Sequence, residues 1–503
     1  MELWQKAILA SYCIIVALLS LYGYHRYLLL RLFYKHRDRP PQPAGHFDQL
    51  PQVTIQLPLY NELHVVDRLL KAVSNIQYPR DRLQIQVLDD SEDDTRDKAR
   101  RAVERLADTG LDIEYLHRSD RHGFKAGALE AGLKRAKGDF ILIFDADFVP
   151  TPDMLLKAIH HFTDEGIGMV QMRWGHLNRD YSLLTHLQSI FLDGHFMIEH
   201  TARSRSGRFF NFNGTAGIWR RQAIEAAGGW QHDTLTEDLD LSYRAQLAGW
   251  KFVYLPDIAV PAEIPVEING FKSQQHRWTK GAVQTAKKIL PRIWRSDQPA
   301  KVKVEATFHL TANISYILML AMALLTLPVL HLRTHLGWER MLIIDLPLFT
   351  MATMAISGFY VASQRALYPD WKAQIKYLPV LMSLGMALCL NNTRAAIEGW
   401  IGHQSSFLRT PKYGVVLQQD GLKKRKYSSQ KTLLALAELF MAGYFGLVLY
   451  QAWITELYFG LPFLFLFHAG FLYIGLLSAF QPWIDQLRIR RQPALNSLPE
   501  TAL

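Results

Sequence analysis

Short apolar runs alternate with helical patterns in the first third of the chain. Val53–Pro58, Leu83–Leu88 and Phe140–Phe144 are apolar or alternating runs of strand length, and Leu63–Ser74 and Thr95–Ala107 have helical spacing. Strands that alternate with helices in this way predict a parallel sheet covered on both faces. The expected fold class is therefore α/β, with ligands bound beyond the carboxyl ends of the strands.

Much longer apolar runs lie toward the two ends of the chain. A run of roughly 20 apolar residues is long enough to cross a bilayer. Tyr377–Leu390 is shorter and predicts an interfacial or re-entrant helix. Five runs are expected to cross: Ala7–Gly23, Ala306–Leu330, Met341–Ala362, Thr432–Trp453 and Leu457–Phe480.

The distribution of basic residues predicts the orientation of these helices. Arg26, Arg31 and Lys35 follow the first run rather than precede it, which indicates an uncleaved helix instead of a signal peptide. Five crossings keep every strongly basic segment on one side of the membrane. The region from about Arg37 to Lys303 is then expected to face the cytoplasm, in a bacterial inner or plasma membrane.

These patterns predict four parts of an integral membrane protein. Residues 1–36 are an N-terminal transmembrane helix with a basic flank, and residues 37–267 are a cytoplasmic α/β domain. Residues 268–303 are an amphipathic interfacial segment. Residues 304–503 are a helical membrane bundle with a cytoplasmic loop at 392–430.

Composition narrows the class of protein. Apolar residues make up 49% and charged residues 20% of the chain, a mixture that fits a soluble domain fused to a membrane part. The net charge of +10 suits an anionic lipid or a nucleotide. The two cysteines lie in apolar segments and offer no disulfide framework. Because no G-x-G-x-x-G follows the first strand and no Walker loop occurs, a dinucleotide dehydrogenase and a P-loop ATPase are disfavoured.

Acidic pairs follow two of the predicted strands. Asp145 and Asp147 form an Asp-x-Asp, a pattern that holds Mg²⁺ or Mn²⁺ beside a diphosphate but also occurs in ordinary turns and caps. Asp89 and Asp90 either cap the next helix or accept a hydrogen bond from a base or ribose. Asp238, in Thr-Glu-Asp, is either part of a helix start or a general base.

Two further motifs combine polar and aromatic chemistry. The glycines of F-N-G-T-A-G, Gly214 and Gly217, either make a turn or allow a ligand to approach the backbone. Gln274, Arg277 and Trp278 form Q-x-x-R-W, where arginine suits a diphosphate and an indole suits a sugar ring. The alternative is an interfacial helix that is anchored by tryptophan and basic residues.

The order of the motifs resembles that of the processive, membrane-bound family 2 glycosyltransferases, most closely the cellulose synthase-like A and C group of mannan and glucan synthases. The resemblance is dense over about residues 53–290 and implies a glycosyltransferase-A fold. The motifs are P-L-Y-N-E (Pro58–Glu62), L-D-D-S (Leu88–Ser91), G-F-K-A-G-A-L (Gly123–Leu129), F-D-A-D-F (Phe144–Phe148), F-N-G-T-A-G (Phe212–Gly217), T-E-D (Thr236–Asp238) and Q-Q-H-R-W (Gln274–Trp278).

The resemblance implies roles for individual residues. Asp238 would be the catalytic base, and Asp145 and Asp147 would hold a divalent metal, Mg²⁺ or Mn²⁺. Phe407, Thr410 and Lys412 match a gating loop, although Arg409 stands where the family usually has valine. Nucleotide-sugar binding would fall to Tyr60, Glu62, Asp89, Asp90, Lys125, Asp145, Gln274 and Arg277. Acceptor binding would fall to Gly214, Thr215, Glu237 and Trp278.

The resemblance also implies a reaction and its partners. The expected activity is inverting, metal-dependent and processive transfer of a hexose from UDP-glucose or GDP-mannose to a growing β-1,4-glucan or mannan. The polymer would leave through the membrane bundle, with membrane lipid and accessory export subunits as further partners and no nucleic acid. One alternative is a non-processive synthase that glycosylates diacylglycerol or ceramide. Another is a transporter with a degenerate nucleotide-sensing domain, which the intact Asp-x-Asp and Thr-Glu-Asp motifs disfavour.

Overall fold

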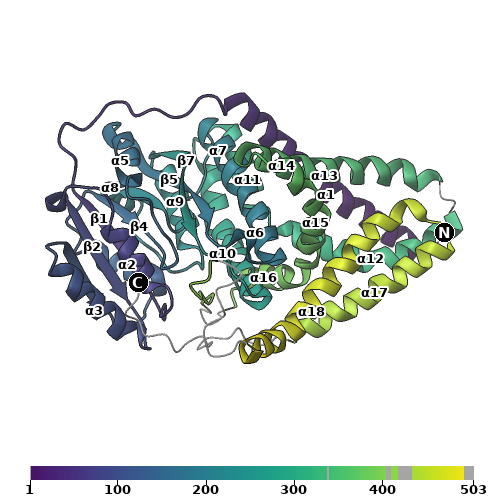
Figure 1. Ribbon diagram of the computed structural model, residues 1–503. Coiled ribbons are helices and arrows are strands. Elements are labelled where there is room, and N and C mark those ends of the chain that lie inside the picture. Colours follow the sequence, from purple (N-terminus) through teal and green to yellow (C-terminus); the bar gives the residue numbers. More distant parts are fainter. Residues whose placement is uncertain (1, 337–338, 404–408, 417–432, 492–503) are drawn as a thin grey trace.

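The chain forms a sheet-containing part and a part made of long helices, side by side (Figure 1). The structure is a computed structural model that describes residues 2–336, 339–403, 409–416 and 433–491. Helix α10 (Ile268–Arg295) packs on α9 (Glu237–Leu247) of the first part and on α16 (Cys389–Ile401) and α18 (Leu461–Arg491) of the second. The predicted Q-x-x-R-W motif lies on this connecting helix.

Seven strands in the described residues form one sheet in the order β3-β2-β1-β4-β6-β5-β7. The central strands are rich in Val, Ile and Leu, and their side chains are buried on both faces, as expected for a sheet covered by helices. The strands are β1 (Val53–Leu59), β2 (Leu83–Asp89), β3 (Asp112–His117), β4 (Phe140–Ile143), β5 (Ile167–His176), β6 (Gly217–Arg220) and β7 (Lys251–Ala262).

The three predicted strands are confirmed as β1, β2 and β4, and they pair in parallel. The helix predicted at Thr95–Ala107 is α3 with those bounds, and the predicted Leu63–Ser74 is α2, which begins later, at Val66. The expectation of a wholly parallel sheet is wrong, because β6 runs antiparallel to both β4 and β5. The chain enters β6 at the carboxyl edge, where the backbone N–H of Ala216 donates to the carbonyl of Ile143, so β6 runs back across the sheet.

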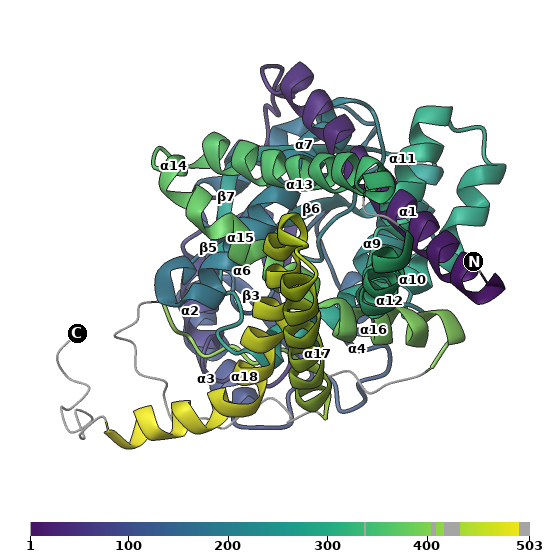
Figure 2. The ribbon, with the colours of Figure 1, turned by 90° about the vertical axis from the view of Figure 1, so that its right-hand side faces the viewer.

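The helices of the first part cover the sheet, and those of the second part form the bundle seen end-on in Figure 2. Between α6 and α7 the helical turns widen into a π-helix, η4 (Gly194–His200). The remaining helices are α1 (Leu3–His36), α2 (Val66–Ser74), α3 (Thr95–Ala107), α4 (Phe124–Leu133), α5 (Met154–Ile159), α6 (Leu183–Asp193), α7 (Thr201–Arg205), α8 (Arg221–Ala226), α11 (Ala300–Thr311), α12 (Ile314–Leu336), α13 (Glu339–Leu367), α14 (Trp371–Gln374), α15 (Leu378–Ala387) and α17 (Leu434–Ile454).

Four described helices are long and apolar enough to cross a membrane: Leu3–His36, Ile314–Leu332, Leu434–Ile454 and Tyr458–Gln481. A fifth candidate is the bent pair Trp371–Ala387 and Cys389–Ile401, which is a broken span or a re-entrant loop with a bend of 41°. The predicted number, five, is the upper end of this range.

The four candidate spans overlap four of the five predicted runs. The remaining run, Met341–Ala362, lies in α13, and its first part falls outside the residues whose surroundings the structure describes, so this span stays a prediction. Tyr377–Leu390, predicted as interfacial or re-entrant, lies within the bent pair, and α16 folds back onto α10.

The two parts share one buried apolar core. Leu187 of α6, Ile198 of η4 and Ile268 of α10 belong to the same cluster as Phe445 of α17 and Phe471 of α18. Burial of large apolar side chains on this scale is the main stabilising contribution at such a contact. The helices that border the sheet are therefore fixed against the bundle.

Candidate active site

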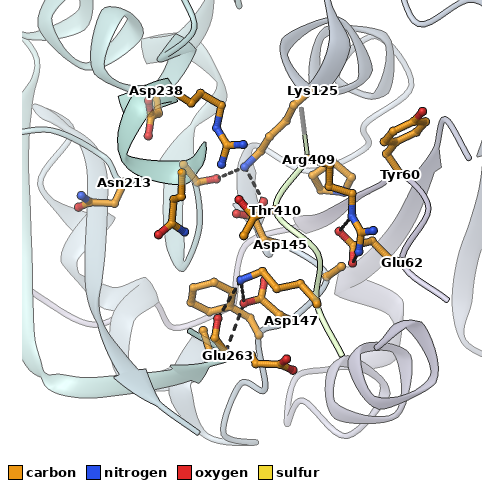
Figure 3. A pocket seen from close by; sticks show the side chains of 18 of the residues that line it. Tyr60, Glu62, Lys125, Asp145, Asp147, Asn213, Asp238, Glu263, Arg409 and Thr410 are labelled. Atoms are coloured by element: carbon orange, nitrogen blue, oxygen red, sulfur yellow. Dashed lines mark hydrogen bonds and ion pairs between the residues drawn. The ribbon is translucent and has the colours of Figure 1, made fainter. Parts of the chain in front are cut away.

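A cavity of about 220 Å³ opens at the carboxyl edge of the sheet. Its walls come from the ends of β1 and β4, the first turn of α4, the first turn of α9, α10 and the segment 409–412. Figure 3 shows this cavity with ten of its residues labelled. The predicted site residues that line it are Tyr60, Glu62, Asp90, Lys125, Asp145, Asp147, Gly214, Glu237, Asp238, Gln274, Arg277, Trp278, Thr410 and Lys412.

Each aspartate of the Asp-x-Asp motif is paired with a lysine. Lys125 Nζ donates to Asp145 Oδ1 at 2.5 Å, and Lys412 Nζ donates to Asp147 Oδ2 at 2.7 Å. Both aspartates follow the end of β4 in a turn that is closed by the Phe148 N–H and the Asp145 carbonyl. This turn, rather than the alternation of side chains along a strand, directs both carboxylates into one cavity.

Lys125 is a fixed cation between two walls of the cavity. It sits at the start of α4, after Gly123 with φ of +72°, and its ammonium also donates to the carbonyl of Gly214 at 2.9 Å. Burial lowers the pKa of Lys125, but the carboxylates of Asp145 and Glu237 outweigh it, and the net pKa is raised. The side chain therefore stays charged at neutral pH.

Asp238 is a half-buried carboxyl with a perturbed pKa. It lies in the first turn of α9, where Oδ1 accepts from the N–H of Leu239 at 2.8 Å. Burial and the neighbouring Glu237 raise its pKa to about 7. A methyl group on Gly214, which has φ of +79°, would lie 3.1 Å from Oδ2 of Asp238. A carboxyl poised near neutrality matches the demand on a general base.

The acidic pair after β2 divides between two environments. Asp90 lines the cavity and is held by the guanidinium of Arg118, with Nε and Nη2 at 2.8 and 2.6 Å from its two oxygens. Asp89 lies behind the cavity, where it accepts from the Ser91 N–H and the Tyr115 hydroxyl. Neither aspartate caps α3, because the N-cap of that helix is Asp94.

Thr215 also lies behind the cavity wall. Its side chain is fully buried, and its hydroxyl accepts from the backbone N–H of Asp145 at 2.9 Å. Thr215 thus ties the F-N-G-T-A-G loop to the Asp-x-Asp turn instead of lining the cavity.

The segment 409–416 lies across the mouth of the cavity. Arg409 forms a bidentate ion pair with the carboxylate of Glu62. Its Nε donates to Oε1 at 2.8 Å, and its Nη2 donates to Oε2. Burial raises the pKa of Glu62 to about 6 even beside this guanidinium. Lys412 also donates to the carbonyl of Glu263 at 2.8 Å. Phe407 lies outside the described residues.

The first turns of α10 supply the remaining predicted wall. Gln274, Arg277 and Trp278 all line the cavity, so the motif faces the sheet rather than only the membrane side of the helix. Burial lowers the pKa of Arg277, and Glu237 and Asp145 act in the opposite direction.

Sequence reasoning did not single out several residues of the site. Glu263 accepts the backbone N–H groups of Tyr413 and Gly414 at 2.9 and 3.0 Å and so holds the segment 409–416. The guanidinium of Arg121 lies 3.3 Å from the ring centroid of Tyr60. Asn213 also lines the cavity. Asn213 lies within the F-N-G-T-A-G motif and Arg121 lies just before G-F-K-A-G-A-L, whereas no local pattern marks Glu263.

Comparison with known proteins identifies the sheet-containing part. The profile of "Glycosyltransferase like family 2" matches residues 51–281. The similarity to this family is confined to residues 51–281, which are less than half of the chain. The family 2 domain covers the strands and every predicted site residue except those of the segment 407–412.

The family 2 domain has named relatives. Glucomannan 4-beta-mannosyltransferase 2 from Arabidopsis thaliana is 42% identical over 281 residues, 54% of this chain and 53% of the relative. Glucomannan 4-beta-mannosyltransferase 1 from Oryza sativa subsp. japonica is 42% identical over 268 residues, 52% of this chain and 51% of the relative. The chain thus spans about half the length of the curated relatives it matches. The predicted resemblance to family 2 glycosyltransferases of the mannan-synthase type is confirmed.

A solved structure shares the fold. It is the mannosyltransferase PcManGT from Pyrobaculum calidifontis, in complex with GDP-Man and Mn²⁺. The match has a TM-score of 0.54 at 20% identity and covers 78% of this chain and 100% of that chain. The predicted glycosyltransferase-A fold is therefore confirmed.

Proposed function

We propose that the chain is an inverting, processive β-glycosyltransferase that takes a hexose from a nucleotide sugar. The observation that carries the proposal is Asp238, a half-buried carboxyl with a pKa of about 7 in the same cavity as the Asp-x-Asp pair. A single base suits a single displacement, in which the acceptor hydroxyl loses its proton to Asp238 as it attacks the anomeric carbon. An α-linked donor then gives a β-linked product.

The chemistry of the lining residues suggests a donor side and an acceptor side of the cavity. Arg277, Gln274 and Lys125 are placed to hold the diphosphate, since guanidinium and ammonium groups are good phosphate ligands. Asp90, Glu62 and Tyr60 would contact the nucleoside. On the acceptor side, Trp278, Glu237 and the backbone at Gly214 would hold the growing sugar end. Asp89 and Thr215 would support these residues from behind.

The oxygen ligands that the Asp-x-Asp motif offers fit a divalent cation. Asp145 and Asp147 supply carboxylate oxygens, the ligands that Mg²⁺ and Mn²⁺ prefer, and the phosphates of the donor would complete the set. Among the described residues no cluster of three or more His, Cys, Asp or Glu could hold a metal alone. Both carboxylates are paired with ammonium groups, and this pairing supports a site that binds positive charge. When bound, the metal would stabilise the departing diphosphate.

GDP-mannose is the favoured donor. The two relatives are named as glucomannan mannosyltransferases, and the solved neighbour holds GDP-Man and Mn²⁺. UDP-glucose is the second donor to test, because glucose and mannose differ in the orientation of one hydroxyl.

A second cavity supports an exit route for the polymer. It measures about 290 Å³ and is lined by residues of α1, α12, α13, α15 and α18, together with Glu199 and Arg203. We propose that residues 1–36 and 304–503 form the membrane part and that the domain 37–267 and the segment 268–303 lie on its cytoplasmic side. Membrane lipid and accessory export subunits are proposed partners, and the basic loop within 392–430 would carry the gating segment.

The test is a donor screen on the full chain in lipid nanodiscs. GDP-mannose, UDP-glucose and UDP-N-acetylglucosamine are supplied with Mn²⁺ or Mg²⁺, and nucleotide release and labelled product are measured. The proposal predicts one preferred donor and an alkali-insoluble product that a β-mannanase or β-glucanase degrades. A product that partitions into organic solvent would instead identify a glycolipid synthase, and absence of turnover with every donor would overturn the proposal.

A further inference from the structure

The π-helix η4 brings two histidines to one side of the chain. His195 and His200 are five residues apart, and their ring centroids lie 4.3 Å apart. On an α-helix, residues five apart are turned by about 140° from one another. A π-helix closes its hydrogen bonds over five residues, so such residues lie nearly above one another. The widened turn is therefore what places the two imidazoles together.

Both histidines hold the side chain of Asn213. His200 Nε2 lies 2.5 Å from Asn213 Oδ1, and His195 Nε2 lies 3.0 Å from Asn213 Nδ2. Asn213 is partly exposed between buried Phe212 and buried Gly214, and it lines the first cavity. Its carboxamide thus presents a held polar group to the space where substrates are proposed to bind.

The direction of each hydrogen bond is determined by Glu199. Burial raises the pKa of Glu199, but Arg203 and His195 outweigh it and hold the pKa well below the usual range. The ionised carboxylate only accepts, so His195 Nδ1, 3.0 Å away, donates to it. The Nδ2 group of Asn213 can only donate, so the Nε2 atom of His195 accepts this hydrogen bond.

His200 is the hydrogen-bond donor to the oxygen of the Asn213 carboxamide. Because Nδ2 of Asn213 faces His195, Oδ1 faces His200, whose Nε2 must donate. The pKa of His200 is well below its usual range, chiefly because the ring is buried, so this imidazole is neutral. Glu199, His195 and His200 form a hydrogen-bonded relay that holds the Asn213 carboxamide in one orientation.

The carboxamide keeps hydrogen-bonding capacity for a ligand. Asn213 has two N–H groups and two acceptor lone pairs on its side chain, and the two histidines use one of each. A sugar hydroxyl both donates and accepts, so it complements the remaining pair. A partly buried hydroxyl site of this kind discriminates strongly, because an unmatched sugar leaves polar groups unpaired.

The position of Asn213 selects the acceptor sugar over the donor nucleotide. Asn213 and Asp238 lie on one side of the cavity in Figure 3, and Tyr60 and Glu62 lie on the other. Asn213 is also next in sequence to Gly214, whose Cα faces the Asp238 carboxylate.

From this geometry we infer that Asn213 hydrogen-bonds a hydroxyl of the acceptor sugar and that His195, His200 and Glu199 are positioning residues that orient its carboxamide. The inference rests on the proposed function and names a specificity-determining residue for it. Asn213 would align the acceptor for attack while leaving the nucleotide untouched.

The test compares two asparagines of the same loop in the full chain in nanodiscs. Asn213→Ala is measured beside Asn211→Ala, since Asn211 is buried, bonds the carbonyl of Phe212 and does not line the cavity. The probe is β-1,4-linked mannotetraose with the preferred donor. Loss of one neutral hydrogen bond predicts a rise in acceptor KM of about 3- to 10-fold for Asn213→Ala. Donor KM and nucleotide release to water should stay within about twofold, and Asn211→Ala should leave acceptor KM unchanged.

Two variants of His200 test whether this histidine orients Asn213, and they leave the loop that contains Asn213 unaltered. His200→Leu removes the donor to Asn213 and should raise acceptor KM as Asn213→Ala does, whereas His200→Gln restores an N–H and should recover at least half of the effect. Two results would overturn the inference, provided that the unaltered chain transfers sugar. In the first, Asn213→Ala and His200→Leu have the same acceptor KM as the unaltered chain. In the second, the donor KM of these variants rises as much as their acceptor KM. Absence of transfer by the unaltered chain overturns the proposed function itself.

Discussion

Lys412 Nζ lies 2.7 Å from Asp147 Oδ2, in a contact that joins residues 265 positions apart in the sequence. The pair is largely buried, with 13% of the lysine side chain and 7% of the aspartate side chain exposed. The ammonium therefore neutralises one oxygen of a carboxylate that is proposed to bind a metal ion. The contact makes the segment 409–416 a competitor of the proposed cation.

Replacement of this lysine should favour metal binding. In Lys412→Gln, Mn²⁺ should bind the nucleotide-free protein about tenfold more tightly, because a partly buried opposing charge is worth about 1–3 kcal/mol. Mn²⁺ titration followed by electron paramagnetic resonance measures this directly. Lys137→Gln, which breaks an exposed pair with Asp112, should have no effect. Unchanged Mn²⁺ affinity in Lys412→Gln would show that Lys412 does not mask the site.

The pH dependence of transfer should report the carboxyl of Asp238. Its pKa is raised to about 7, so the base is protonated and inactive below that pH, and kcat/KM should fall about tenfold per pH unit there. Glu237→Gln removes a negative neighbour that raises this pKa, so the acid limb should move to lower pH. The control Glu225→Gln changes an exposed residue paired with Arg221 and should leave the limb in place. A limb that does not move in Glu237→Gln would exclude Asp238 as its origin.

Gly214 should be intolerant of a side chain for a reason beyond its backbone angle. In Gly214→Ala the methyl group would press on Oδ2 of Asp238, and displacement of the base should lower the transfer rate by about 100-fold. Gly249→Ala is the matched control, with φ of +98° and no described heavy atom within 4 Å of the added methyl. The two variants should show similar thermal stability, and only Gly214→Ala should lose activity. Equal rates in the two variants would contradict the contact with Asp238.

Glu305 joins three helices through buried charge. Its two oxygens lie 2.9 Å from Arg203 Nε of α7 and 3.0 Å from His25 Nε2 of α1. Glu305→Ala would leave the Arg203 charge uncompensated in the interior and should destabilise the chain by about 3–5 kcal/mol. Thermal unfolding in detergent measures the loss, with exposed Glu104→Ala as the control. An unchanged melting temperature would show that water reaches Arg203.

Much of the fold follows from local sequence. The strand β4 is a continuous run of Phe, Ile and Leu, and β1 and β2 alternate Val, Ile and Leu with polar residues, so each has a pattern typical of strands. The antiparallel β6 could not be predicted, since its direction depends on where the chain re-enters the sheet after α7. The bend of 41° between α15 and α16 could not be predicted either, because length and hydropathy do not encode how a helix pair folds back.

The site was predictable as a set of motifs but not as a network. Strand ends of a parallel sheet meet at one edge, so Asp90 and Asp145 were expected together. The pairing of Arg409 with Glu62 joins residues 347 positions apart, and no local pattern encodes it. The relay through His195 and His200 depends on a π-turn, which replaces the regular 3.6-residue period that sequence reading assumes.

The most direct test of the account is the product formed from labelled GDP-mannose by the full chain and by Asp238→Asn, with donor binding measured on the same samples. The account predicts a β-linked, β-mannanase-sensitive product from the unaltered chain. Asp238→Asn should bind the donor within about twofold and transfer at least about 100-fold more slowly, because a general base contributes about 10²–10⁴-fold. Transfer by Asp238→Asn at the unaltered rate, or an α-linked product, would contradict the claim that Asp238 deprotonates the acceptor in a single displacement.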